Sequence, residues 1–267
     1  MTRLDQLENR SLYIIREAFF RYRNVAALWS MGKDSTTLVW LCRKAFLGRV
    51  PFPVMHIDTG CKFARIYEFR DHFAREWGLS LVIARNDEAL ARGVSHKGGA
   101  RLECCTELKT HALRQAIASR GFDALLLGIR RDEHGIRAKE RHFSPRDEGF
   151  RWEHLNQPVE PWDAFKASAG AGEHVRVHPL LDWTELDVWE YVRRESLPVI
   201  DLYFARFGKR YRSIGCEPCC EPVESAAENV DEIIEELRTT RVAERSGRAQ
   251  DKEDPNAMQK LRMLGYM

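Results

Sequence analysis

The residues best suited to chemistry near the start of the chain form a short polar loop, SMGKDS, at positions 30–35. It directly follows the apolar run 25–29, which predicts an extended segment that enters a turn and then a helix. Gly32 allows a ligand to approach the backbone, and the first N–H groups of a helix attract anions. Lys33 adds a cation, and two serines add hydroxyl donors. The loop therefore predicts a phosphate site, with an ordinary strand–turn–helix as the alternative.

The loop is not a Walker loop, because the pattern GxxxxGK[ST] is absent. It resembles instead the pyrophosphate-binding loop of enzymes that cleave ATP between the α and β phosphates. That resemblance implies transfer of AMP rather than of a phosphoryl group. It also implies which residues hold the nucleotide: Ser30, Gly32, Lys33, Asp34 and Ser35.

Predicted strands and helices alternate through the first part of the chain. Apolar runs predict strands at 25–29, 54–58, 81–84 and 124–128, and periodic patterns predict helices at 4–21, 34–45, 65–77 and 107–119. The strand runs are continuously apolar, which is typical of a parallel sheet with helices on both faces. Ligands in such sheets bind beyond the carboxyl ends of the strands. Asp58 and Gly128, which end two of these runs, are therefore expected beside the loop.

The second part of the chain has a different character. Residues 132–172 are polar and rich in Gly and Pro, which predicts a mobile loop or lid, and 175–180 are expected to form an edge strand. Thr184 and Asp187 have capping-box spacing at the start of a helix. We expect an α/β domain over residues 1–200, followed by a cysteine motif, a helix and a charged tail over 201–267. The tail from about 241 to 255 is expected to be loosely ordered.

Charged residues gather after the run that ends at Gly128. Arginine binds phosphate or sulfate in a bidentate manner, whereas lysine acts as a point charge. A solvated charge run is the alternative, but its place beside two other polar strand ends favours an anion site. The five cations are Arg130, Arg131, Arg137, Lys139 and Arg141. Asp58 is expected to face a ribose hydroxyl or Mg²⁺, and the alternative is that it caps its own turn. The tail segment 243–251 is either a contact for an anion or a partner, or an ordinary polar tail.

The cysteines form two motifs far apart in the sequence. Cys104 and Cys105 are adjacent, and Cys216 and Cys219 form a C-x-x-C. Four thiolates suit zinc or an iron–sulfur cluster, and a redox-active dithiol or buried free thiols are the other interpretations. Adjacent cysteines suit two irons of a cubane cluster better than one tetrahedral zinc. Three cysteines belong to neither motif: Cys42, which is expected in the core, Cys61 and Cys220.

Composition limits the possible partners. The 267 residues carry a formal net charge of +2, which gives no overall field for binding nucleic acid. No apolar run approaches the roughly 20 residues of a membrane span, and the charged start of the chain lacks a signal-peptide core. We therefore expect a cytoplasmic protein with no membrane or nucleic-acid partner.

The sequence is similar over nearly its whole length to the small subunits of bacterial sulfate adenylyltransferases. The most specific segments are RRDE at 130–133, RAKER at 137–141 and PLLDWTE at 179–185. This resemblance implies an adenine-nucleotide α-hydrolase-like fold, shared with phosphoadenylyl-sulfate (PAPS) reductases. It implies formation of adenylyl sulfate (APS) and pyrophosphate from ATP, with Mg²⁺, and sulfate, assisted by a GTPase large subunit. Lys33, Arg130, Arg131 and Arg137 are then the expected catalytic residues, with Lys109, Lys139 and Arg141 as further sulfate contacts.

One feature departs from many members of that family. Cys104, Cys105, Lys109 and the segment SIGCEPC at 213–219 resemble the [4Fe–4S] site of bacterial APS reductases. Those reductases also use a cysteine in a C-terminal tail, and no cysteine follows Cys220 here. The resemblance therefore favours an adenylyltransferase subunit that has kept a cluster. The alternatives are an APS or PAPS reductase, a cluster-dependent enzyme that inserts sulfur into RNA, and a non-catalytic nucleotide-binding subunit with structural zinc.

Overall fold

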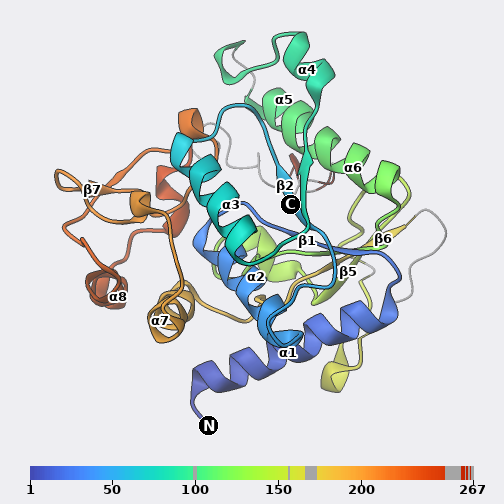
Figure 1. Ribbon diagram of the computed structural model, residues 1–267, viewed down its shortest axis with the longest axis horizontal. Helices are drawn as coiled ribbons and strands as arrows, with labels where there is room; N and C mark the ends of the chain where they lie inside the picture. The colour runs from blue at the N-terminus through green and yellow to red at the C-terminus, as the bar shows by residue number, and fades with distance from the viewer. Residues whose placement is uncertain are drawn as a thin grey trace.

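The computed structural model describes residues 1–98, 101–155, 157–165, 173–249, 260–261, 263 and 265. At its centre is a six-stranded sheet in the order β3-β2-β1-β4-β6-β5 (Figure 1). Five strands are parallel, and β5 pairs with β6 in the antiparallel direction. In chain order the strands are β1 (Val25–Leu28), β2 (Val54–Ile57), β3 (Leu81–Ala84), β4 (Ala124–Leu126), β5 (Phe143–Arg146) and β6 (His174–Val177). The predicted parallel α/β architecture is confirmed.

Helices cover both faces of the sheet because successive strand residues point to opposite sides. On one face Ala27 and Leu126 belong to a core shared with α1 (Arg3–Arg21), α2 (Lys33–Ala45), α3 (Ala64–Glu76) and α7 (Glu185–Glu195). On the other face Ala26 and Leu125 pack against α6 (Ala112–Arg120). This double coverage explains why the central strands read as unbroken apolar runs. The capping box predicted for α7 is confirmed, since Asp187 N–H donates to Thr184 Oγ1 over 3.1 Å.

Two predictions about the middle of the chain are wrong. The expected loop at 132–172 contains β5, and β6 lies between β4 and β5 rather than at the edge. The sequence disguises β5 because its last residue is charged. Arg146 is nevertheless fully buried and forms an ion pair with Glu140 at 3.0 Å, while Phe143 packs on Phe165. Residues 156 and 166–172 of that expected loop lie outside the described residues.

The helix predicted at 107–119 starts earlier and is irregular. It is built from α5 (Arg101–Cys105), a π-helical segment (Thr106–His111) and α6. Single π turns inside helices are frequent at functional sites. The remaining helices are α4 (Asp87–Ala91) and α8 (Val230–Thr239), with 3₁₀ turns at His96–Gly98, Gly135–Lys139, Pro161–Asp163, Asp201–Tyr203, Glu217–Cys219 and Glu244–Gly247.

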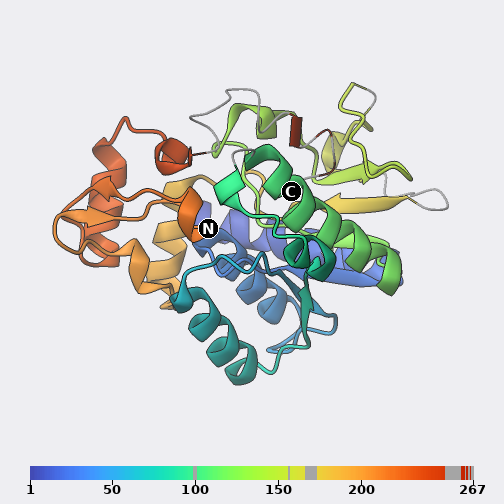
Figure 2. The same cartoon turned by 90° about the horizontal axis from the view of Figure 1, so that it is seen from above.

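Residues 201–239 form a unit at one side of the sheet (Figures 1 and 2). It contains α8, which packs on α7, and a hairpin of β7 (Lys209–Arg210) and β8 (Val223–Glu224). Residues 241–249, which we term the strap, return to the polar loop at 30–35. The strap was expected to be loosely ordered, but Glu244 and Arg245 are buried, so the prediction is wrong up to residue 249. Residues 250–255 of that tail lie outside the described residues.

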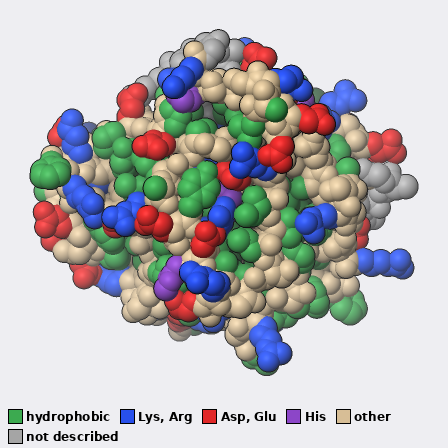
Figure 3. Space-filling view, turned by 45° about the horizontal axis from the view of Figure 1, so that its top comes forward, with side chains coloured by type: hydrophobic (Ala, Val, Ile, Leu, Met, Phe, Trp, Pro, Cys, Tyr) green, Lys and Arg blue, Asp and Glu red, His purple; other side chains and the backbone are tan. Residues whose placement is uncertain are grey.

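The surface offers no strong single-sign field on the face seen in Figure 3, where basic and acidic side chains are interspersed. None of the helices in the described ranges combines the length and the apolar character needed to cross a membrane. The proposed division of the chain at residue 200 stays a prediction.

Candidate nucleotide-binding site

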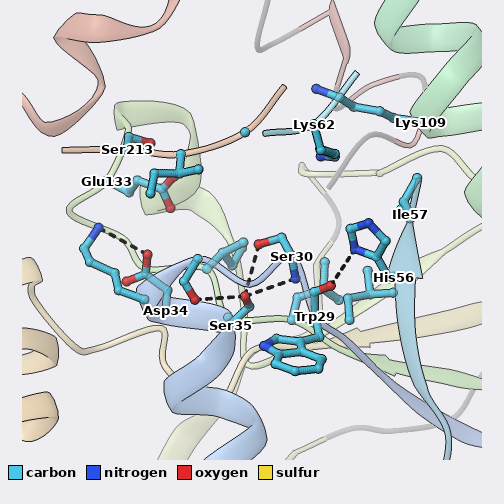
Figure 4. A pocket seen from close by; sticks show the side chains of 18 of the residues that line it. Trp29, Ser30, Asp34, Ser35, His56, Ile57, Lys62, Lys109, Glu133 and Ser213 are labelled. Carbon is cyan, nitrogen blue, oxygen red and sulfur yellow. Dashed lines mark hydrogen bonds and ion pairs between the residues drawn. The ribbon is translucent and has the colours of Figure 1, made fainter. Parts of the chain in front are cut away.

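The polar loop between β1 and α2 has a defined internal structure. Ser30 N–H donates to Ser35 Oγ over 3.1 Å, the two hydroxyls are 3.0 Å apart, and Ser35 Oγ donates to the Gly32 carbonyl over 3.1 Å (Figure 4). Gly32 is the N-cap of α2, and the residue with positive φ is Met31, at 62°. The two serines therefore shape the loop, and the N-terminus of α2 presents its partial positive charge there.

This loop forms one wall of a pocket at the carboxyl ends of β1, β2 and β4, as the topology predicts. Part of the pocket lining is apolar and fits the face of an aromatic base. It is formed by Leu28, Met55, Ile57, Leu127 and Ile129. The rest of the lining is polar and charged, and fits anionic groups. It is formed by Ser30, Gly32, Lys33, Asp34, Ser35, Lys62, Lys109, Glu133, Arg137, Tyr203, Ser213, Arg245 and Arg248.

Close packing explains why the pocket-lining position 128 is a glycine. A Cβ at this position would lie 3.0 Å from both the carbonyl carbon and the carbonyl oxygen of Asp34 and 3.1 Å from Ser35 N. These are backbone atoms of the first turn of α2, which cannot move without moving the helix. A glycine therefore lets the helix N-terminus approach the end of β4.

Lys33 and Arg130 lie in a buried network of charges. Lys33 is 1 % exposed, and its Nζ forms ion pairs with Glu244, with Asp34 at 3.4 Å and with Glu185 at 3.9 Å. Arg130 is fully buried and also pairs with Asp34 and Glu244. Burial alone would raise the pKa of Glu244, but the two adjacent cations hold that pKa far below its ordinary value. The strap thus places a carboxylate between the two cations.

Several cations complete the polar wall. Arg137 pairs with Glu133, and the same carboxylate lies 3.3 Å from Arg245 of the strap. Arg248 donates to Ser213 Oγ over 3.0 Å. Figure 4 shows Lys62 and Lys109 on one side of the pocket and Asp34 and Glu133 on the other. The sequence had flagged the strap only as one of two interpretations, and no pattern pointed to Lys62 or Tyr203.

Other predicted site residues lie outside the pocket wall. Arg131 is one-third exposed and pairs with Asp182, and Lys139 is exposed. The Arg141 carbonyl accepts from His178. Asp58 accepts from Gly60 N–H over 2.9 Å and from the Tyr67 hydroxyl over 2.8 Å, so it caps its own turn. Arg130 does not line the pocket and contacts it through its ion pairs with Asp34 and Glu244.

The pocket contains a histidine that is unsuited to proton transfer. His56 is fully buried, and its Nδ1 lies 3.1 Å from the Trp29 carbonyl oxygen. Burial lowers the pKa of His56 to about 4, so the ring is neutral near pH 7. Among the described residues that line the pocket, His56 is the only histidine. The geometry therefore favours chemistry between groups that are already ionised.

A second, small cavity adjoins the pocket and shares Lys109 with it. It is lined by all four cysteines of the two motifs, Cys104, Cys105, Cys216 and Cys219, and by Cys61. The π-helical segment directly follows Cys105 and carries Lys109 to the boundary between the cavities. Burial raises the pKa of the Cys104 thiol to about 11, so this thiol stays protonated near neutral pH unless a metal binds it.

Within the described ranges, no three His, Cys, Asp or Glu side chains come close enough to hold one metal ion. One zinc ion requires all of its ligands about 2.0–2.3 Å away. A cubane cluster is held by four thiolates, one on each of its four irons.

The comparisons agree with this architecture. Residues 24–222 match the family model of the phosphoadenosine phosphosulfate reductase domain. A PAPS reductase from Candida auris has the same fold, with a TM-score of 0.57 and 17 % identity over 84 % of this chain and 98 % of that chain. The sheet, the strand-end loop and this match define an adenine-nucleotide α-hydrolase-like protein.

Curated relatives narrow the assignment. Sulfate adenylyltransferase subunit 2 from Saccharophagus degradans is 40 % identical, and that from Aeromonas hydrophila is 38 % identical. Each alignment covers 100 % of this chain and 98 % of the relative. The chain belongs to the sulfate adenylyltransferase subunit 2 family. The family resemblance recognised in the sequence is therefore confirmed.

Proposed function

We propose that this chain forms APS and pyrophosphate from ATP and sulfate. The observation that carries the proposal is the pocket itself, which combines apolar residues, a helix N-terminus and a set of cations. The apolar residues fit adenine, and the loop at 30–35 fits the phosphates. AMP transfer to sulfate also requires a second anion beside the α phosphate, and two further arginines, Arg137 and Arg245, line the same pocket.

In the proposed step a sulfate oxygen attacks the α phosphorus, and the bond from that phosphorus to the bridging oxygen breaks. Pyrophosphate leaves with the electron pair. The N-terminus of α2 and the loop hydroxyls stabilise the charge on the leaving group. Arg137 and Arg245 hold sulfate against the α phosphate, since two anions repel each other unless cations lie between them. Lys62 and Lys109 provide further positive charge on the opposite side.

No general base is required, because sulfate is fully ionised at neutral pH. This agrees with a pocket whose histidine is neutral and hydrogen-bonded to the backbone. Lys33 and Arg130 act mainly as positioning residues in this proposal, since carboxylates of the chain already surround them.

ATP enzymes of this kind use Mg²⁺, which prefers oxygen ligands and binds through one or two carboxylates and the substrate phosphates. Asp34 and Glu133 are the carboxylates that line the pocket, so the residues fit the ion. When bound, Mg²⁺ neutralises phosphate charge. Both carboxylates also hold cations of the pocket in place.

The term "subunit 2" in the names of the relatives implies a partner subunit. We propose a GTPase large subunit, as the family resemblance implies, because APS formation is unfavourable and needs an energy source.

The reverse reaction tests the proposal without the partner. The purified chain is supplied with APS, pyrophosphate and Mg²⁺, and ATP is measured by luciferase light output. ATP formed in a 1:1 ratio to APS consumed supports the adenylyltransferase. If folded chain converts no APS, alone or with the GTPase subunit and GTP, the proposal is wrong.

A matched pair of variants locates the anion site. Arg137→Ala removes a cation from the pocket wall, whereas Arg131→Ala removes one that pairs with Asp182 outside it. We expect kcat/KM to fall about 100-fold for Arg137→Ala and less than about fivefold for Arg131→Ala, as a charge-assisted contact is worth ~1.5–3 kcal/mol. Equal losses would contradict the proposed placement.

We further propose that Cys104, Cys105, Cys216 and Cys219 hold a [4Fe–4S] cluster. The supporting observation is that these four side chains from two distant segments line one cavity. A bound cluster would supply redox chemistry beside Lys109. No step of AMP transfer needs it.

Anaerobic reconstitution with iron and sulfide tests this cofactor. We expect equal amounts of bound iron and sulfide, lost in Cys219→Ser and retained in Cys42→Ser, a buried cysteine of α2 outside the cavity. Unchanged binding in Cys219→Ser would refute the ligand set. The same cavity also favours a second candidate, an APS reductase, which would release sulfite from APS in the presence of a thiol reductant.

A further inference from the structure

A fifth thiol lies beside the four expected cluster ligands. Cys61 follows β2 and lines the same cavity as Cys216. Thr59 Oγ1 lies 3.3 Å from Cys61 Sγ and 3.2 Å from Cys216 Sγ, so one hydroxyl joins the two thiols. Neither cysteine motif includes Cys61, so the proposed cluster leaves this residue without a role.

The backbones that carry these two thiols are also joined. Glu217 N–H donates to the Cys61 carbonyl over 2.9 Å, and Lys62 pairs with Cys216 in an antiparallel bridge. A disulfide needs Cα atoms about 4.4–6.8 Å apart and side chains that point toward each other. Two thiols that share one hydroxyl and lie on paired backbone segments approach this arrangement, so little backbone movement is needed to link them.

We propose that Cys61 and Cys216 form a reversible disulfide with a peroxide when Cys216 is not bound to a cluster. Cys61 is partly exposed and Cys216 is buried, so the peroxide enters beside Cys61. One of the two sulfurs attacks the O–O bond, one water leaves, and a sulfenic acid forms. The sulfur of the other cysteine then displaces the second water. Two thiols and one hydrogen peroxide give one disulfide and two waters.

The link would connect two walls of the nucleotide pocket. The residues on either side of the turn that carries Cys61 contribute Ile57 and Lys62 to the pocket, and the residues before Cys216 contribute Ser213 and Ile214. A disulfide between them would fix these walls relative to each other. It would also compete with iron for Cys216. The disulfide requires neither the proposed activity nor the proposed cluster to be correct.

The test is peptide mapping of the full chain. Cluster-free protein is treated with hydrogen peroxide, its remaining thiols are alkylated, and it is digested with trypsin without reductant. Cleavage after Arg49 and Lys62 isolates Cys61, and cleavage after Arg212 isolates a peptide with Cys216, Cys219 and Cys220. We expect these two peptides to be cross-linked, and the cross-link to disappear on reduction.

Variants identify the partner within the second peptide. We expect Cys216→Ser to abolish the cross-link and Cys219→Ser to keep it, with far-ultraviolet circular dichroism confirming that both variants fold. If Cys216→Ser does not fold, alkylation of the partly reduced wild-type peptide identifies the linked sulfur instead. A Cys61 that stays free in oxidised wild-type protein, or that links equally well in Cys216→Ser, would overturn the proposal.

Discussion

The nucleotide pocket and the cysteine cavity are neighbours that are built in different ways. The pocket is lined by the ends of three adjacent parallel strands, and its buried charges are largely paired with charges of the same chain. The cavity brings together an irregular helix, a strand-end turn and a C-terminal loop, and it presents thiols. In the pocket, ion pairs offset the desolvation cost of the buried charges. The cavity exists only where three separate segments contact one another, and its chemistry depends on what binds the sulfurs.

The sharpest way to break the pocket is to remove its central carboxylate. Glu244→Ala removes one of the two carboxylates that the buried Lys33 and Arg130 share, the other being Asp34. We expect the free energy of unfolding, measured with urea, to fall by about 3–5 kcal/mol. Glu235→Ala, at an exposed ion pair on α8, should change it by less than ~0.5 kcal/mol. A loss as small as that of the control would show that the network contributes little.

The buried histidine of the pocket predicts a pH dependence. Because the pKa of His56 is about 4 in the folded chain and 6.5 in the reference state, the unfolded chain binds more protons between these values. Stability contributed by neutral His56 is complete above pH 6.5 and is lost as the pH falls toward 4, by up to about 3 kcal/mol. We expect His56→Gln to flatten the stability–pH curve in this window.

The control for that curve is His72→Gln, whose side chain is 63 % exposed. It should leave the slope unchanged. His174, whose pKa burial lowers to about 3, adds its own slope in both variants, so the curve becomes shallower in His56→Gln but not flat. Parallel curves for wild type and His56→Gln would contradict the assignment.

Gly128→Ala tests the contact between β4 and α2. The new methyl group would press on the backbone of Asp34 and Ser35. We expect a loss of about 1–3 kcal/mol in stability, together with weaker ATP binding by calorimetry, since the helix N-terminus must shift. Gly135→Ala is the matched control, because nothing lies within 4 Å of its added Cβ. Unchanged ATP affinity in Gly128→Ala would show that ATP binding does not depend on this packing contact.

The smallest expected effect concerns the boundary between the two regions. Lys62→Ala and Lys109→Ala each remove a pocket cation, and each should raise KM for APS about 5–30-fold, equivalent to ~1–2 kcal/mol. Only Lys109 also lines the cysteine cavity. In reconstituted protein, Lys109→Ala alone should lower the reduction potential of the cluster, measured by redox titration. An equal shift in Lys62→Ala would show that the cavities are not electrostatically distinct.

The same comparison explains what the sequence could predict. The loop at 30–35 and the central strands depend on local patterns, namely continuous apolar runs and turn residues, and both were recognised. The ordered position of the strap and the strand β5 were not predicted, because their burial depends on partners far away in the chain. In the sequence, Glu244 belongs to a polar tail, and only the fold places Lys33 and Arg130 beside it. Likewise, the charge of Arg146 indicates a surface residue, and only the fold places Glu140 beside it.

Site residues follow the same rule. The cysteines could be grouped from spacing alone, but nothing in their spacing placed Cys61 among them. Neighbours in sequence also separate in space, since Arg130 lies behind the pocket, Arg131 faces Asp182 and Arg137 lines the pocket wall. Charge runs therefore identify an anion site without identifying which cations serve it.

The strap carboxylate also gives the pocket a built-in competitor. With Glu244 seated between Lys33 and Arg130, an incoming phosphate that seeks these cations must replace one anion with another, so the net charge of their immediate surroundings changes little. Association that exchanges anions in this way depends less on ionic strength than binding to bare cations. The ground state of the protein thus stores, in its own chain, the negative charge that a nucleotide would otherwise have to bring.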